Sequence, residues 1–433
     1  MMVRMYLTML SIVCVIISGT VSPLRSAAVD AYIESISHGE KYNISIGNFA
    51  VFTDEEIKIS DTLVKAIKND LLFSRLFDII DPKKQVYGKQ PEFIFWKKLG
   101  TQILVSGSVM THSGGDLFFT GKVFDIETEE QLFSEVYQGK TDNPKVLAHR
   151  FVDDIVFRFT GEQGVAQTKI VFVNNQTGKK ELWMMDYDGD NVQKLTSDNS
   201  VVTMPRWSYD GKKVYYTSYK SGNPDIFEMD INNRKARSVV QQQGLCIMGA
   251  QSFDGQKYTV VLSKDGNPEI YVLDNEYNIT KRLTWNRAVD VSPSFSPNNR
   301  DVVFTSGRSG VPQLYVTDTD GIMLRRLSYG GYCDSPAWSP RGRLIAYAAQ
   351  VAKAFQITVV EPDVSNSFPE QLTTAGSNEN PSWSPNAQWI VFSSNRSGRY
   401  ELYRITVDGQ VQQRVANIKG DSTLPCWSPC VIK

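Results

Sequence analysis

The residues that could support catalysis or bind a metal are few and lie far apart in this sequence. The chain has three histidines, His38, His112 and His149, which limits any histidine-based chemistry. It has no G-x-S-x-G nucleophile turn, no H-E-x-x-H pair and no G-x-x-x-x-G-K-[ST] phosphate loop. Ser309 lies in an Arg-Ser-Gly turn, but the same turn recurs at Ser397 and indicates a repeated structural feature. We therefore expect no catalytic residue, no metal site and no cofactor.

Two polar or sulfur-containing segments have alternative interpretations. The aspartate-rich residues 186–190 have the composition of a calcium loop, but the glycine stands at the wrong offset and no glutamate follows at the twelfth position. A turn between two strands explains them without a metal. Cys426 and Cys430 flank a Trp-Ser-Pro turn, and a disulfide between them remains open, although extended residues four apart would be too distant to pair.

The composition excludes some classes of partner. The 433 residues include 46 lysines and arginines and 47 aspartates and glutamates, which gives a net charge of −1. A near-neutral chain of this kind has no bulk electrostatic attraction to nucleic acid or to an anionic membrane.

The first 28 residues predict a cleaved export signal. Arg4 precedes an apolar run of about 13 residues, and small residues at 26–28 offer a cleavage site. The run is shorter than the roughly 20 residues that span a bilayer, which disfavours the alternative of a retained anchor. Cleavage would leave 44 basic and 47 acidic residues, a net charge of −3.

A repeat of about 44 residues organises the rest of the chain. Six segments, such as MPRWSYDGKKVYYTS and SPSFSPNNRDVVFTS, share an anchor residue followed by serine and a turn, which is Ser-Pro in four of them. Five anchors are aromatic, and every segment but the last continues into an alternating strand. Their anchor residues are spaced 44, 44, 43, 45 and 44 apart, and they are Trp207, Gln251, Phe295, Trp338, Trp383 and Trp427. Four short strands in about 44 residues make one blade of a β-propeller.

The two ends of the repeat region predict how the propeller closes. Residues 169–173 match the second strand of a blade but lack an aromatic-Ser-Pro strand before them, whereas residues 425–429 are such a strand without a blade after them. Pairing these ends would complete a sixth blade and leave no large unpaired edge. The predicted fold is a six-bladed all-β propeller over residues 167–433, closed by its two chain ends.

Residues 29–166 predict a separate α/β domain. Strands are expected at 43–50, 76–80, 102–110, 116–125 and 131–137, and helices at 54–76, 91–99 and 144–159. The helix at 54–76 has apolar residues near helical spacing, and the last helix ends at Thr160-Gly161.

A propeller without catalytic residues leaves a binding surface as the functional site. The loops that enter the innermost strands open beside the central channel, at residues 200–206, 244–250, 286–293, 329–336, 376–381 and 419–425. Four of them carry an acid, namely Asp290, Asp334, Glu379 and Asp421. These acids either focus a negative potential on a basic partner or a cation, or cap their own turns. Both interpretations remain open together.

The whole chain after residue 28 resembles the TolB family of periplasmic Tol–Pal proteins. Besides the repeats, the resemblance rests on Asn69-Asp70-Leu71, Leu76-Phe77-Asp78-Ile79-Ile80-Asp81, Trp96-Lys97-Lys98-Leu99-Gly100, Ala148-His149-Arg150 and Thr160-Gly161-Glu162. It implies a monomeric, non-enzymatic periplasmic scaffold that maintains outer-membrane integrity and helps the outer membrane constrict at division. One departure is the stretch 245–251, where family members often have a proline and polar residues.

The resemblance also implies partners and contact residues. The peptidoglycan-associated lipoprotein Pal would bind the channel loops, through Thr203, Met204, Arg206, Ile247, Met248, Asp290, Ser292, Asp334, Ser335, Asn378, Glu379, Asp421 and Thr423. The inner-membrane protein TolA would bind the start of the mature chain, through Val29, Asp30, Tyr32, Ile33, Glu34 and Ile36. Other outer-membrane proteins are further expected partners, whereas nucleic acid and a membrane-spanning segment in the mature chain are not expected.

Two other functions fit a secreted propeller. It could select peptides for a peptidase, but such enzymes carry an added hydrolase domain for which this chain has no room. It could also bind carbohydrate through exposed Trp and Tyr, although most of the anchor aromatics are expected to pack between blades.

Overall fold

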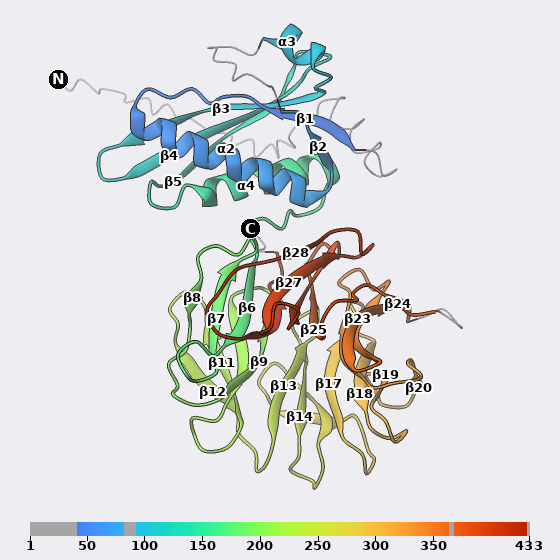
Figure 1. The fold of residues 1–433 in the computed structure, drawn as a ribbon. Coiled ribbons are helices and arrows are strands. Elements are labelled where there is room, and N and C mark those ends of the chain that lie inside the picture. The colour runs from blue at the N-terminus through green and yellow to red at the C-terminus, as the bar shows by residue number, and fades with distance from the viewer. Residues whose placement is uncertain (1–40, 82–91, 363–367, 431–433) are drawn as a thin grey trace, which may run out of the picture.

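The structure is a computed structural model that describes residues 41–81, 92–362 and 368–430. Figure 1 shows a small α/β domain packed on one end of a propeller. The predicted fold class is confirmed, since one five-stranded sheet is followed by six four-stranded sheets. The predicted export signal and the predicted TolA segment at 29–36 lie outside the described residues. None of the described helices is long and apolar enough to cross a membrane.

The α/β domain has the predicted order of elements. They are β1 (Tyr42–Ile46), α2 (Asp54–Ser74), β2 (Phe77–Ile79), α3 (Phe93–Lys98), β3 (Ile103–His112), β4 (Asp116–Asp125), β5 (Gln131–Lys140) and α4 (Lys145–Thr160). The sheet order is β2-β1-β3-β4-β5, and α2 and α4 pack together against the sheet. β1 ends earlier than expected. Ile46 pairs with Val105 and Ala50 bridges Ser108, so one strand has an extra residue that interrupts the pairing.

Helix α2 shows why the sequence folds locally as it does. Thr53 accepts a hydrogen bond from the Glu56 backbone, and the Glu56 side chain accepts one from Thr53, which forms a capping box. The helix ends at Arg75, which takes a left-handed conformation with φ 61°. Its apolar face, which includes Leu63 and Ile67, is fully buried against the sheet and α4. The helix is thereby fixed, and its last turn projects toward the propeller.

Each propeller blade is a four-stranded antiparallel sheet. Blade 1 combines β29 (Ser422–Trp427) with β6 (Lys169–Asn174), β7 (Glu181–Asp186) and β8 (Gln193–Lys194). Blades 2 and 3 consist of β9 (Val202–Trp207), β10 (Lys213–Ser218), β11 (Asp225–Asp230), β12 (Ala236–Val240), β13 (Cys246–Gln251), β14 (Tyr258–Leu262), β15 (Glu269–Leu273) and β16 (Ile279–Arg282). Blade 4 consists of β17 (Asp290–Phe295), β18 (Asp301–Ser306), β19 (Gln313–Asp318) and β20 (Leu324–Arg326). Blades 5 and 6 consist of β21 (Cys333–Trp338), β22 (Ile345–Val351), β23 (Ala354–Val360), β24 (Glu370–Gln371), β25 (Asn378–Trp383), β26 (Trp389–Ser394), β27 (Glu401–Thr406) and β28 (Gln412–Arg414).

Blade 1 takes its innermost strand from the other end of the propeller segment. β29 pairs antiparallel with β6, with Ser422 opposite Asn174 and Trp427 opposite Ile170. The inner strands contact one another in the order β9, β13, β17, β21, β25, β29 and again β9. Closing contacts of this kind leave the inner edges of the blades covered rather than exposed.

The two ends of the propeller have different environments. Turns after the inner strands and turns between the third and fourth strands lie on the side of the α/β domain, which we call the near face. There Phe73 stacks on Trp389 with ring centres 4.5 Å apart, and Arg75 pairs with Asp408 at 2.7 Å. The opposite end, where the inner strands begin, is the far face. Among the described residues, the contacts between the two domains lie on the near face. They therefore leave the far face accessible to other molecules.

Candidate binding site on the propeller

Most of the predicted contact residues lie in the first half of the inner strands, toward the far face, whereas Arg206 lies one residue before the end of β9. The expected loops are shorter than predicted, because the inner strands are already paired from residues 202, 246, 290, 333, 378 and 422. Asp290, for example, lies opposite Ser306 in the first register pair of β17. All the predicted contact residues except Asp421 are consequently strand residues.

Two of the predicted contacts are buried and serve to hold arginines. Asp290 is 0% exposed and accepts hydrogen bonds from Arg308 at 2.8 Å and from Asn286 at 2.5 Å. Burial raises its pKa, and Arg308 opposes that effect. Asn378 occupies the equivalent place in blade 6 and accepts from Arg396 at 2.8 Å. The prediction that these two side chains face a partner is corrected, since both are enclosed.

Met248 also departs from the prediction, because its side chain is buried in the core of blade 3. Its neighbour Gly249 replaces the proline of the other repeats, and a Cβ there would come within 2.5 Å of Pro293. Blade 3 therefore packs more closely against blade 4 at this position. Ile247 is half-buried, so it is the remaining predicted contact of this segment.

The three other predicted acids are half-buried near the far mouth of the channel and have internal partners. Asp334 accepts from the Thr305 hydroxyl at 2.9 Å and the Ser335 backbone at 2.6 Å. Glu379 accepts from the Tyr400 hydroxyl at 2.7 Å, and Asp421 from the Tyr400 backbone at 3.0 Å. Burial raises the pKa of Asp334, and the nearby Glu379 carboxylate contributes to the rise. Donors from other segments, Thr305 and Tyr400, thus hold all three acids, so the capping of their own turns does not account for them, and they gather negative charge at this mouth.

A cavity of about 390 Å³ occupies the central channel, from the middle of the inner strands to the near face. It is lined by Met204, Arg206, Ser292 and Ser335 among the predicted contacts, so the structure brings these four together. The residue before each anchor is small in five blades, namely Ala250, Ser294, Ala337, Ser382 and Cys426. Arg206 is the exception, and its guanidinium donates to the Gly249 and Pro205 carbonyls at 2.8 Å each. It is the one charged side chain among the lining residues, so this part of the channel is positive.

The middle of each inner strand has an unusual backbone. The residue before the proline has a positive φ in five blades, at Met204, Ser292, Ser335, Asn380 and Leu424. The pairing with the second strand shifts register at the same places. The local twist turns these side chains toward the channel, whose cavity they line. No signal in the sequence other than the repeated X-Pro step marks this feature.

The five predicted aromatic anchors, Trp207, Phe295, Trp338, Trp383 and Trp427, are buried between blades. The Trp207 indole donates to the Cys426 carbonyl at 3.1 Å, and the Trp383 indole to the Ala337 carbonyl at 2.9 Å. These bonds satisfy the buried N–H and tie neighbouring blades together.

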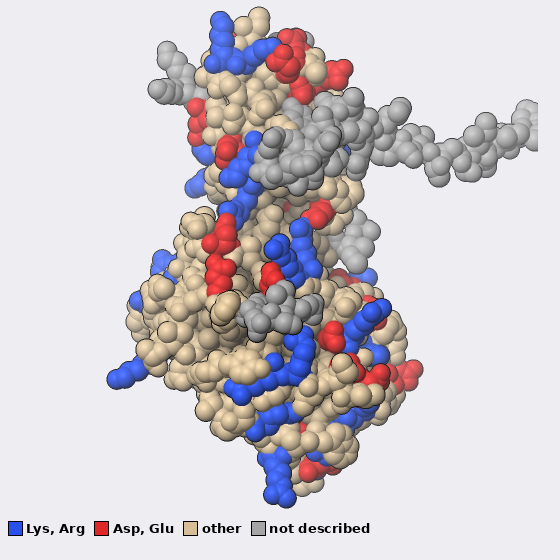
Figure 2. Space-filling model, turned by 90° about the vertical axis from the view of Figure 1, so that its right-hand side faces the viewer, with Lys and Arg blue, Asp and Glu red and all other residues tan. Residues whose placement is uncertain are grey.

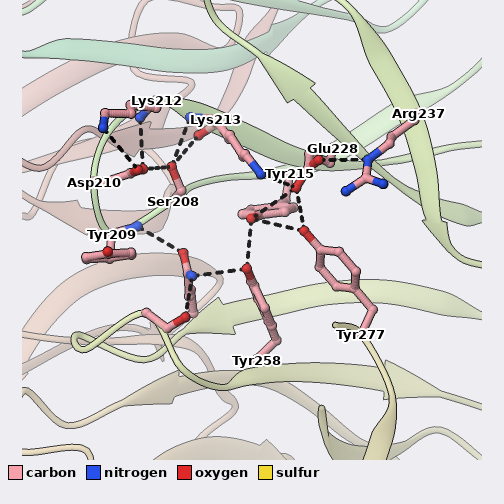
Figure 3. Close-up of polar contacts among 12 residues, drawn as sticks. Ser208, Tyr209, Asp210, Lys212, Lys213, Tyr215, Glu228, Arg237, Tyr258 and Tyr277 are labelled. Carbon is pink, nitrogen blue, oxygen red and sulfur yellow. Dashed lines mark hydrogen bonds and ion pairs between the residues drawn. The ribbon is translucent and has the colours of Figure 1, made fainter. Parts of the chain in front are cut away.

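Blade 3 lacks an aromatic anchor, and a polar network occupies its place (Figure 3). Gln251 donates to the Tyr258 hydroxyl at 3.1 Å, which lies 2.9 Å from the Tyr215 hydroxyl of blade 2. Glu228 of blade 2 accepts from Lys213 and Arg237 at 2.9 Å each and from Tyr277 of blade 3. Burial would raise the pKa of Glu228, but these donors outweigh burial and lower it. The network was not predicted, because its members come from different repeats. It joins blades 2 and 3 where the repeat is broken.

Residues 186–190 and the cysteines Cys426 and Cys430, which had alternative interpretations, make contacts within the protein. Within 186–190, Asp186 pairs with Lys169 at 2.5 Å and Asp190 with Lys145. Among the described residues, no group of three histidine, cysteine or acidic side chains could hold a metal. Cys426 and Cys430 are free thiols, and Cys430 donates to the Gly164 carbonyl at 3.2 Å.

A polar cluster that the sequence did not reveal connects the domains. His149 of α4 donates from Nδ1 to Asp70 of α2 at 2.7 Å, and Tyr187 of blade 1 donates to the other Asp70 oxygen. All three side chains are buried. Burial opposes the charged imidazole, but the Asp70 carboxylate outweighs burial and raises the pKa of His149. The cluster fixes the α/β domain on the near face.

Comparisons with known proteins bear on the same two domains. The family model described as the TolB amino-terminal domain matches residues 34–132, and the one described as the TolB beta propeller domain matches residues 156–431. The Tol-Pal system protein TolB of Rickettsia prowazekii is 31% identical over 207 residues, which are 46% of this chain and 46% of that protein. The TolB of Ruegeria sp. is 34% identical over 205 residues, or 45% of each. The chain thus matches less than half the length of these curated relatives.

A solved structure agrees over a greater length. The crystal structure of TolB from Acinetobacter baumannii is similar with a TM-score of 0.77, covering 90% of this chain and 97% of that chain at 24% identity. This likeness extends the common fold across both domains. The propeller family model alone covers well over half of the chain. The chain belongs to the TolB family of Tol–Pal system proteins.

Proposed function

We propose that the protein is a non-enzymatic periplasmic scaffold of a Tol–Pal system, whose propeller binds Pal on the far face. The observation that carries this proposal is the arrangement of the two domains. Interdomain contacts involve the near face, while Asp334, Glu379 and Asp421 gather at the opposite mouth of the channel. An inner ring of paired strands, whose far end the described residues leave uncovered, suits the binding of a folded partner.

The electrostatics of the surface support a protein partner rather than a polyanion. Figure 2 shows basic and acidic side chains interspersed on one side of the molecule, with uncharged surface between them. Extended single-sign patches of the kind that bind nucleic acid are not seen in this view. The TolA role proposed for residues 29–36 rests on the family resemblance, and these residues lie outside the described part of the chain.

Affinity purification from envelope extracts tests the proposal. The tagged full-length protein is expected to recover Pal, identified by mass spectrometry, because the two associate in the periplasm. A matched variant, Asp334→Lys with Glu379→Lys, reverses the charge at the far mouth and is expected to recover severalfold less Pal. Recovery of a peptidase or its substrates without Pal would replace the scaffold by the peptide-processing alternative.

A further inference from the structure

Two exposed aromatic side chains occupy equivalent positions in consecutive blades. Trp285 and Tyr329 are 73% and 75% exposed, stand 44 residues apart, and follow the outermost strands β16 and β20 on the far face. The corresponding residues of blades 1 and 5, Ser197 and Thr374, are small and polar. Single exposed aromatics need no explanation, but the same exposure at repeated positions of one face marks a surface.

Each aromatic ring is held by an arginine three residues before it. The Arg282 guanidinium lies 3.9 Å from the Trp285 ring centre, donates to the Thr284 carbonyl at 3.0 Å and pairs with buried Glu269 at 3.3 Å. Arg326 lies 4.6 Å from the Tyr329 ring centre and donates to the Ser328 carbonyl at 2.7 Å. We call these four residues the aromatic platform. Because its arginines are already fixed, a partner that docks there has less side-chain freedom to remove.

The platform carries uncompensated positive charge. Arg282 is balanced by Glu269 and Asp265, whereas the described residues provide no ion pair to Arg326 or to exposed Arg287 in the adjoining loop. The predicted acid Asp290, which begins the strand after the Trp285 loop, is enclosed with Arg308 and offers no charge to the surface. Exposed Val289 and Val311 lie beside the same loop, where Gly307 of the Val311 turn donates to the Val289 carbonyl. The surface is thus aromatic, apolar and basic.

The polar side chains beside the platform have few free hydrogen-bonding groups with which to bind a sugar. The Thr284 hydroxyl donates to Glu269 at 2.5 Å, and the Asn286 amide donates to Asp290 at 2.5 Å. Glycan recognition needs free hydrogen-bonding groups beside the stacking ring, which these internal bonds remove. Projecting Trp, Tyr and Arg side chains are instead the residue types that dominate protein–protein binding energy.

We propose that the aromatic platform of blades 3 and 4 is the main docking surface for an acidic and apolar patch of a protein partner on the far face. The partner presents carboxylates to Arg326 and Arg287 and an apolar recess that receives the Trp285 and Tyr329 rings. This proposal rests on the proposed function, since the partner is the Pal lipoprotein of the preceding section. It shifts the principal contacts from the channel loops to the outer part of two blades.

Calorimetric titration of the full-length chain with the soluble domain of Pal tests the platform. Trp285→Ala and Tyr329→Ala are each expected to weaken binding by about 10-fold or more, as truncation of a hot-spot aromatic does. Arg326→Glu is expected to weaken it at low salt more than at high salt, because it reverses the attraction. The matched control is Tyr209→Ala, which removes a 45% exposed ring at the near mouth and is expected to leave the affinity unchanged.

Each outcome decides between distinct conclusions. If the native chain binds Pal and the platform variants bind it equally well, the platform is wrong and the proposed function stands. If the native chain does not bind Pal, both proposals fail. If the variants keep Pal affinity but lose binding to soluble peptidoglycan fragments, the platform is a glycan site and the protein-docking proposal is overturned. Thermal unfolding of each variant is expected to match the native chain, since the rings are exposed.

Discussion

A chain truncated after Asp421 is expected to lose the cooperative unfolding of the propeller. The truncation removes β29, which leaves the inner edge of β6 without its partner and separates blade 1 from blade 6. It also removes Trp427, whose indole donates to the Thr168 hydroxyl at 2.8 Å. Calorimetry should show a broadened transition at much lower temperature. An unchanged transition would contradict a structural role for the pairing of the two ends.

A point variant makes the same test with less disruption. Trp427→Ala is expected to lower the free energy of unfolding by about 3–5 kcal/mol, the usual cost of emptying a buried tryptophan site. Trp285→Ala is the matched control, because it deletes the same side chain from an exposed position in blade 3. A similar loss of stability in both variants would show that the closing strand has no special importance.

The second large effect is expected at the interface between the domains. Asp70→Asn removes the carboxylate that binds His149 and Tyr187, so the α/β domain should detach from the near face more easily. Removing one member of a buried charge pair costs about 3–5 kcal/mol. The measurement is the free energy of unfolding of native and variant chains at pH 6. Arg75→Ala, which breaks the more exposed pair with Asp408, serves as the control and is expected to cost about 1 kcal/mol or less.

The interface should also depend on pH in a defined direction. Asp70, Asp186 and Asp188 favour the charged imidazole of His149, whose pKa is raised above 6.5 in the folded state. The stabilisation is therefore greatest below pH 6.5 while Asp70, whose own pKa is raised by burial, stays ionised, and it is lost as the pH rises through the folded pKa of His149. Of the other groups around the pair, Tyr187 and Lys145 remain protonated up to alkaline pH because their pKa values are raised, whereas burial lowers the pKa of Arg404. Burial raises the pKa of the neighbouring Asp153 to about 6, so its titration is confined to the acidic part of the range. The stability difference between native and Asp70→Asn chains should thus shrink as the pH rises. A constant difference from pH 5 to 9 would exclude His149 as its source.

The repeat made most of the fold predictable from the sequence. Its spacing and its Ser-Pro turns give the blades, and the unmatched strands at 169–173 and 425–429 indicate the β29–β6 pair. The α/β domain followed from helical and alternating patterns, apart from the early end of β1. These features are local or periodic, which is why pattern alone can identify them.

The features that the sequence missed depend on contacts between distant segments. Asp70 lies in α2, His149 in α4 and Tyr187 in the turn after β7, and they share no sequence pattern. Asp290 was expected at the surface because it lies in a turn, but the arginine that encloses it comes from the next strand connection. The repeat does show that the two platform aromatics, Trp285 and Tyr329, are 44 residues apart and so occupy equivalent positions. The sequence does not show that both rings are exposed, because exposure depends on how the blades fold.

Direct titration of the purified full-length chain with the soluble domain of Pal from the same genome is the most decisive measurement of the central claim. Saturable binding with one Pal per chain is expected, and it should weaken in the Asp334→Lys, Glu379→Lys variant of the far mouth. The Arg75→Ala variant of the near face should bind as the native chain does. Absence of saturable binding at millimolar Pal, with the chain fully folded by calorimetry, would contradict the account.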